Sequence, residues 1–168
     1  MKKKINKEDL DNGYINGEKH KIMHYEFLNA FAHLEFILNY CVSSYFTSNE
    51  KAKMELTDLV LSRLNSRDLF KIFCQILKKK KIDTLTDEDS NKTFESLKEL
   101  RNTLAHSFYI PTNNFKAKKG IVVTKIRDSK LKGYRQDISI VDYESKWKSL
   151  QNMIGSVQKI MYEHFYKK

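Results

Sequence analysis

The sequence predicts a mainly α fold, an antiparallel bundle of about five helices with a basic β-hairpin inserted before the last helix. Two observations lead to this fold class. The 168 residues include only 5 Gly and 1 Pro, which leaves few places for the tight turns that sheet-rich folds need. Apolar residues recur along most of the chain at spacings of three and four, which is the period of an amphipathic helix.

The first half of the chain predicts a polar arm followed by three helices. Residues 1–18 are polar and contain the turn signals Asn12-Gly13 and Asn16-Gly17, so we expect an irregular arm before a helical domain of residues 19–168. Apolar periodicity predicts a long helix over about 20–46. Capping residues at 47–50 and 65–66 then begin a second and a third helix. The apolar residues of the second helix are Met54, Leu56, Leu59, Val60 and Leu64.

The second half predicts a helix, a hairpin and a last helix. Asp87 to Asn91 begins a fourth helix, which must end before Pro111. Between residues 116 and 141, the β-branched runs IVVTKI and DISIV flank a polar stretch with a glycine, which favours a β-hairpin. Asp142 is expected to cap a last helix that runs nearly to the end of the chain.

Composition narrows the class of protein. The formal charge of +10 favours an anionic partner, and no apolar run is long enough for a membrane span. The start MKKKINKEDLDNG has no apolar stretch of a secretory signal, so we expect a cytoplasmic protein without membrane attachment. Cys41 and Cys74 lie in apolar helical stretches, which indicates buried, reduced thiols rather than a disulfide or a zinc pair.

One segment carries a chemical motif. The string LKELRNTLAHSFYIP contains Arg101, the polar Asn102 directly after it, and His106 after four intervening residues. This pattern resembles the signature of the HEPN superfamily, and the helical layout of residues 20–165 is loosely similar to it. The resemblance implies a HEPN-like helical bundle and a metal-independent ribonuclease of the toxin–antitoxin or anti-phage type. It also implies that Arg101 and His106 are catalytic, with Asn102 as a positioning donor.

Helix geometry complicates this assignment. At about 100° per residue, Glu95, Glu99, Asn102 and His106 share a polar stripe, while Arg101 lies about 140° from His106. The two groups meet only through the reach of the arginine, a helix end or a second copy of the chain. RNA cleavage without metal needs one group to take the proton of the 2′-OH and another to protonate the leaving oxygen. We therefore expect a homodimer through the motif-bearing helix.

Glu99 is a candidate supporting residue from the residues alone. If its carboxylate neighbours the imidazole, directly or through Asn102, it favours the protonated ring and orients it. The alternative is a solvated surface glutamate.

Positive charge concentrates directly after the motif. Residues 115–135 hold eight Lys and Arg against one Asp, 8 − 1 = +7 of the total +10. A basic hairpin with an aromatic residue suits an RNA backbone and a stacked base, although lysines also protect an edge strand from aggregation. The candidate RNA-binding residues are Lys118, Lys119, Lys125, Arg127, Lys130, Lys132, Tyr134 and Arg135.

Other polar clusters have simpler explanations. His20 and His24 are i,i+4 neighbours, but no spacing fixes a third ligand, so we expect no metal site and no cofactor. The run Lys78 to Lys81 falls where a helix C-terminus favours cations.

The leading hypothesis is therefore a metal-independent endoribonuclease that cleaves single-stranded RNA, with RNA, a second copy and an antitoxin or regulatory protein as partners. The alternative is a non-catalytic HEPN-like module that binds RNA, a nucleotide or a protein. A third hypothesis is a structural dimerisation protein whose basic hairpin maintains solubility.

Overall fold

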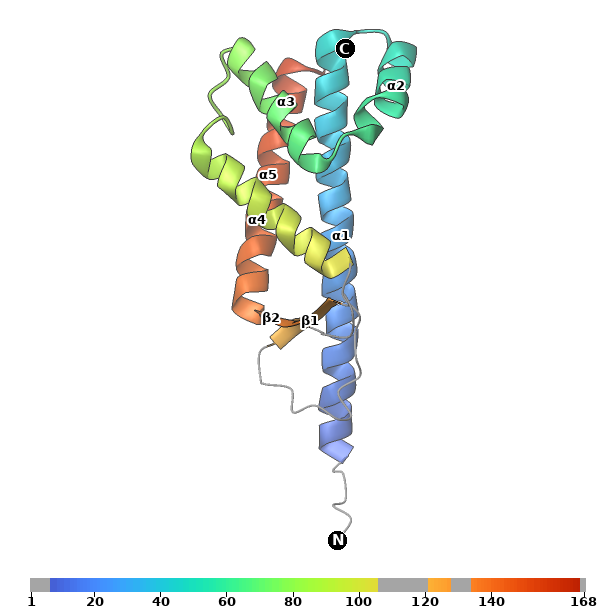
Figure 1. Cartoon of the computed structure of the whole chain (residues 1–168), viewed down its shortest axis with the longest axis vertical. Coiled ribbons are helices and arrows are strands. Elements are labelled where there is room, and N and C mark those ends of the chain that lie inside the picture. The colour runs from blue at the N-terminus through green and yellow to red at the C-terminus, as the bar shows by residue number, and fades with distance from the viewer. Residues whose placement is uncertain (1–6, 106–120, 128–133, 167–168) are drawn as a thin grey trace. The chain divides into compact units, whose positions relative to one another are not determined.

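The computed structural model describes the backbone of residues 7–105, 121–127 and 134–166, and the side chains of 22–105 and 141–166. Five α-helices dominate these residues (Figure 1), so the mainly α class is confirmed. They are α1 (Lys7–Phe46), α2 (Glu50–Leu59), α3 (Ser66–Lys79), α4 (Glu88–Ala105) and α5 (Ile140–His164), with a short 3-10 turn at Leu61–Arg63. None of these helices, not even the 40-residue α1, contains an apolar stretch sufficient to cross a bilayer.

Two strands lie between α4 and α5. Strand β1 (Ile121–Arg127) pairs antiparallel with β2 (Tyr134–Ser139). The register pairs Arg127 with Tyr134 at one end and Ile121 with Ser139 at the other, with an irregularity between Ile121 and Val123.

The chain divides into two compact units. The first combines Met1–Leu28 with Arg101–Ser145, and the second combines Asn29–Leu100 with Lys146–Lys168. Helices α1, α4 and α5 each have one segment in the first unit and another segment in the second.

The core of the second unit is aliphatic and aromatic. The rings of Phe70 and Phe94 stack with centroids 4.1 Å apart, and the ring of Phe31 lies 5.9 Å from that of Phe94. Burial of each side chain of this size stabilises the folded state by about 1.5–3 kcal/mol. The buried residues of the long helices are Phe31, Leu34, Ile37, Leu38, Cys41 and Val42 in α1, Leu69, Phe70, Phe73, Cys74, Ile76 and Leu77 in α3, Phe94, Leu97 and Leu100 in α4, and Leu150, Met153, Val157 and Ile160 in α5.

The predicted helix starts of α2 and α3 are confirmed. The side chain of Asn49 accepts a hydrogen bond from the backbone N–H of Ala52, and that of Asn65 accepts one from Asp68. An asparagine oxygen at this position satisfies one of the backbone donors that the first helical turn leaves without a partner.

Three predicted boundaries were wrong. The second helix, expected to carry Leu64, ends at Leu59 and is followed by the 3-10 turn. The expected irregular arm of residues 1–18 gives way to helix from Lys7, because extending an existing helix adds a hydrogen bond per residue and each glycine opposes it by only about 1 kcal/mol. The last helix begins at Ile140, so Asp142 lies in its first turn rather than before it. Ile140 and Val141 are β-branched and suit a strand, but the described ladder ends at Ser139.

Both cysteines are buried and free, as the sequence predicted. Burial raises the pKa of the Cys41 thiol to about 12 and that of Cys74 to about 11. Because the thiolate is the reactive form, we expect neither cysteine to react with a disulfide reagent such as DTNB at pH 8 in the folded protein. Both are expected to react in guanidinium chloride; fast labelling of one thiol under native conditions would show that it is accessible.

Candidate functional site

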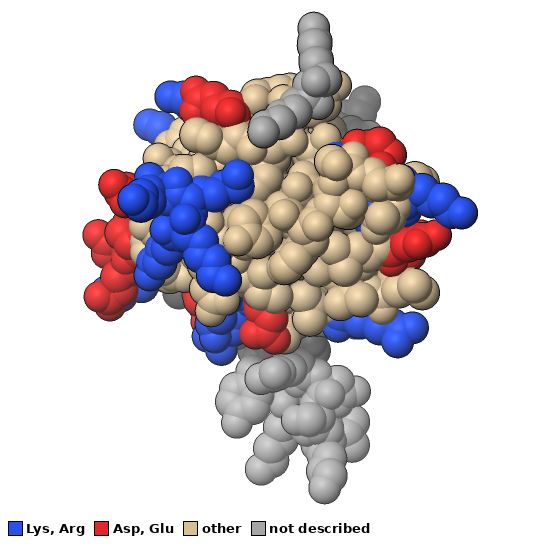
Figure 2. All heavy atoms as spheres, turned by 90° about the horizontal axis from the view of Figure 1, so that it is seen from above, with Lys and Arg blue, Asp and Glu red and all other residues tan. Residues whose placement is uncertain are grey.

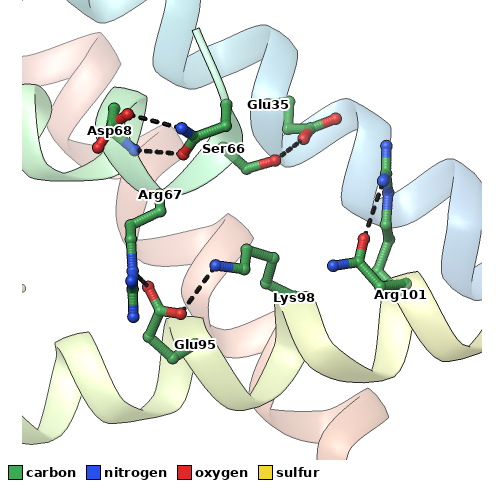
Figure 3. A network of polar contacts seen from close by, with 9 residues as sticks. Glu35, Ser66, Arg67, Asp68, Glu95, Lys98 and Arg101 are labelled. Carbon is green, nitrogen blue, oxygen red and sulfur yellow. Dashed lines mark hydrogen bonds and ion pairs between the residues drawn. The ribbon is translucent and has the colours of Figure 1, made fainter.

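The motif-bearing end of α4 holds an ordered arginine. The apolar stripe of the helix is buried at Leu97, Leu100 and Leu104, which leaves Arg101 half-buried at its edge, as the helical periodicity predicted. A guanidinium N–H of Arg101 donates to Oδ1 of the half-buried Asn102 at 3.0 Å, the bond drawn at Arg101 in Figure 3. The two polar residues at the start of the motif are therefore brought together.

A histidine from α1 contacts the same helix end. Helix α4 is described as far as Ala105. The Nε2 atom of His24 lies 2.6 Å from the carbonyl oxygen of Leu104, within the first unit. Because a carbonyl only accepts, Nε2 carries the hydrogen and donates it. His24 thus holds the end of the motif-bearing helix to α1.

Sequence reasoning missed this role of His24, although a signal was present. His24 continues the spacing of the apolar stripe of Phe27, Phe31 and Leu34 towards the N-terminus. A polar ring at such a position needs a hydrogen-bond partner, because a buried donor without one is destabilising. The spacing indicates that the ring of His24 needs a hydrogen-bond partner. It does not identify that partner, which lies 80 residues away.

Tyr143 completes the described core of the first unit. Its ring lies 5.8 Å from that of the fully buried Phe27, and its hydroxyl donates to the backbone carbonyl of Met23. Burial, with a smaller contribution from Glu26, raises the pKa of the Tyr143 hydroxyl. The start of α5 is therefore tied to α1 one residue away from His24.

The His24 contact makes a testable prediction about stability. His24→Ala removes the hydrogen bond that Nε2 donates to the Leu104 carbonyl, and we expect a loss of about 1–3 kcal/mol in the free energy of unfolding. His24→Gln retains an N–H donor and should recover part of this loss. The exposed His164 serves as control, since its replacement by alanine should change stability by less than about 0.5 kcal/mol. Urea unfolding measures all three; equal effects of Ala and Gln at position 24 would contradict the capping role.

Glu99 lies in the part of α4 that belongs to the second unit. Its side chain is exposed and lines an open groove of about 520 Å³ together with Arg67, Lys71 and Glu95. Its expected effect on His106 stays a prediction, because His106 lies outside the described residues.

Two residues of this groove, Arg67 and Glu95, belong to an ion-paired network with Lys98 (Figure 3). Glu95 accepts from Nε of Arg67 at 2.6 Å and from Nζ of Lys98 at 2.9 Å. Burial by itself raises the pKa of Glu95, but these two hydrogen bonds outweigh it and hold the pKa below its usual value. Glu95 is therefore ionised at neutral pH and is paired with two cations.

Some of the predicted RNA-binding residues lie in segments that the structure describes, and others lie outside them. Lys125 and Arg127 lie in β1, and Tyr134 and Arg135 in β2. The register pairs Lys125 with Gln136 and Arg127 with Tyr134, so two cations and the aromatic residue occupy positions of one face of the pair. Lys118, Lys119, Lys130 and Lys132 lie outside the described residues.

Metal ligands do not cluster in the part of the chain that the structure describes. No group of three or more His, Cys, Asp or Glu side chains there is arranged to hold a metal ion. His24, which sequence spacing paired with His20, donates to a backbone carbonyl instead.

The chain has no match among protein-family models, curated proteins or solved structures. Its function is therefore argued from its own residues. The resemblance of the RNTLAH segment to the HEPN superfamily stays a prediction.

Proposed function

We propose that this chain is a metal-independent endoribonuclease of the HEPN type that cleaves single-stranded RNA. The observation that carries the proposal is the hydrogen-bonded pair of Arg101 and Asn102 near the end of α4, which ends directly before His106 in the sequence. A guanidinium matches two phosphate oxygens at once, and a neighbouring amide that already orients it also offers a donor.

The residues present suit an internal transfer at phosphorus. A general base removes the proton of the ribose 2′-OH, and the 2′-oxygen forms a new bond to phosphorus. The bond from phosphorus to the 5′-oxygen breaks, and a general acid protonates that oxygen. The products are a 2′,3′-cyclic phosphate and a 5′-hydroxyl end. His106 acts as acid or base, and Arg101 stabilises the negative charge that develops on the phosphate oxygens.

Two proton transfers favour two copies of the chain. One imidazole cannot serve as base and acid in the same step, and a twofold-symmetric dimer supplies His106 and Arg101 twice. We place this homodimer interface at the motif-bearing end of α4. Glu99 would orient or charge an imidazole there.

The basic strands supply the second part of the proposal. Lys125, Arg127 and Tyr134 occupy one face of the antiparallel pair, which suits a phosphate backbone and a stacked base. Lys118, Lys119, Lys130 and Lys132 would extend this contact, whereas Arg135 pairs with Ile126 and would contribute charge from the opposite face. The cellular setting we propose is a cytoplasmic toxin–antitoxin or anti-phage system, in which a regulatory protein holds the nuclease inactive.

Cleavage of labelled single-stranded RNA in EDTA tests the proposal. The wild-type protein should cut, and Arg101→Ala should lower the rate by about 10²–10³-fold, the usual effect of removing one charge-stabilising group. Arg101→Lys retains the positive charge but loses the planar guanidinium that contacts two phosphate oxygens, so its cleavage rate should remain well below that of wild type. Arg63→Ala is the matched control, because Arg63 is exposed in the turn after α2. Wild-type protein that fails to cut any RNA overturns the proposal.

A non-catalytic module that binds RNA, a nucleotide or a protein is the second candidate. The hydrogen bond between Arg101 and Asn102 also favours this candidate, because a half-buried arginine held by its neighbour is typical of a residue with a structural role. Tight RNA binding by the wild type without cleavage would support this alternative.

A further inference from the structure

Exposed aromatic side chains gather where α1 and α5 end in the second unit. Phe46, Tyr162 and Tyr166 are 64%, 62% and 51% exposed, which is unusual for side chains that folding normally buries. Tyr162, Tyr166 and Tyr40 form one set, because the ring of Tyr166 lies 5.7 Å from that of Tyr162 and 6.5 Å from that of Tyr40. The ring of Tyr45 meets that of Phe46 edge to face at 5.2 Å.

Lys80 lies between the Tyr45–Phe46 pair and the buried ring of Phe165 at the end of α5, and the buried Lys53 contacts Tyr40. Nζ of Lys80 lies 5.0 Å from the ring centroid of Phe165 and 6.0 Å from that of Tyr45, and Nζ of Lys53 lies 5.0 Å from Tyr40. Lys80 belongs to the exposed run Lys78 to Lys81 at the end of α3. We call the rings of Tyr40, Tyr45, Phe46, Tyr162 and Tyr166 with Lys78 to Lys81 the aromatic–lysine surface.

The four lysines of this run are not neutralised within the described part of the chain. No ion pair is found there for any of them, whereas Lys51, Lys92 and Lys98 on other helices each pair with a glutamate. A helix C-terminus favours cations, which applies to Lys78 and Lys79 in the last turn of α3, whereas Lys80 and Lys81 lie beyond the helix. Figure 2 shows a wide uncharged face with Lys and Arg side chains gathered along one edge and Asp and Glu at places around its rim.

We propose that the aromatic–lysine surface binds single-stranded nucleic acid, with bases stacked on exposed tyrosine rings and phosphates beside the Lys78 to Lys81 run. This inference rests on the proposed function in one respect, because it identifies the bound nucleic acid as the RNA that the nuclease cleaves. The surface would then hold RNA separately from the cleavage motif and the basic strands.

The chemistry favours an unpaired polynucleotide over a protein partner. Exposed tyrosines supply ring faces for stacking, and a run of unneutralised lysines beside them supplies counter-charges at the spacing of a flexible backbone. Protein interfaces are depleted in lysine, and an arginine-rich rather than lysine-rich rim is usual there. A second copy of this chain would also bring two like-charged lysine runs towards each other.

Binding of a fluorescent, fully 2′-O-methylated single-stranded RNA measures this surface without cleavage, because the probe has no 2′-OH nucleophile. The double variant Tyr162→Ala, Tyr166→Ala should raise Kd by about tenfold, while Tyr162→Phe, Tyr166→Phe retains the rings and should bind like wild type. Lys79→Gln, Lys81→Gln should weaken binding and reduce the salt slope of log Kd by about 0.7 for each lost phosphate contact. Lys92→Gln, Lys148→Gln removes the same charge from exposed positions of α4 and α5 and should have a smaller effect.

The outcomes separate this inference from the proposed function. If wild type cuts RNA but the tyrosine and lysine doubles bind the probe unchanged, the surface inference is overturned and the nuclease proposal stands. If those doubles lose binding while wild type never cuts in EDTA, the surface stands and the nuclease proposal falls. Absence of probe binding by wild type overturns the inference. The inference is also overturned if the variant Tyr162→Ala, Tyr166→Ala sediments as a monomer, wild type sediments as a dimer, and the RNA affinity of the variant is unchanged. The aromatic–lysine surface would then contact a second copy of the chain.

Discussion

Replacing His106 by alanine is expected to lower the rate of RNA cleavage in EDTA by about 10²–10⁴-fold, the usual contribution of a positioned general acid or base. No other group in the RNTLAH segment transfers protons near neutral pH, so Asn102 and Thr103 offer no substitute. Single-turnover cleavage of a labelled RNA measures the effect. The far-ultraviolet circular dichroism of the variant should match wild type.

The matched control is His164→Ala, which removes an exposed imidazole near the end of α5. It should cut at the wild-type rate. Cleavage by the His106→Ala protein within threefold of wild type would remove the imidazole from the mechanism and leave Arg101 without its proposed partner.

The largest expected effect on stability comes from Phe94→Ala. Phe94 is fully buried and stacks on Phe70 with an angle of 3° between the rings, so its removal leaves a cavity between α3 and α4. Phenylalanine to alanine in such a site destabilises by about 3–5 kcal/mol, a large share of the about 5–15 kcal/mol that holds a typical domain folded. Urea unfolding monitored by circular dichroism measures the change.

Phe36→Ala is the control for this prediction. Phe36 lies on α1 and is 66% exposed, so its loss should change the free energy of unfolding by less than about 0.5 kcal/mol. Phe94→Leu should fall between the two variants because it refills part of the cavity. Equal stability of Phe94→Ala and Phe36→Ala would mean that the ring stack contributes little to the core.

Local signals explain why the helices of the second unit were predictable. An asparagine cap such as Asn65 acts within three residues, and the buried stripe of α4 follows from its own spacing. Boundaries failed where extension competes with turn signals, as at Gly13 and Gly17, and at Ile140, where β-branched residues begin the last helix instead of continuing a strand. Periodicity also fails to say whether an apolar face is covered, since Met54 and Leu59 of α2 remain exposed.

Only the contacts between residues close in sequence were predictable in the candidate site. Arg101 and Asn102 are neighbours in sequence, and their proximity needs no tertiary fold. The His24 contact joins residues 80 positions apart, and the aromatic–lysine surface joins the ends of three helices. Such pairings depend on how helices pack together, which spacing along one helix does not encode.

The chemistry of the cut ends tests the central claim most directly. Wild-type protein in EDTA should leave 2′,3′-cyclic phosphate and 5′-hydroxyl ends, and a substrate with 2′-deoxyribose at the cleaved position should stay intact. Products with 3′-hydroxyl and 5′-phosphate ends, formed only with added magnesium and equally from the deoxy substrate, would contradict a cleavage site built from Arg101 and His106.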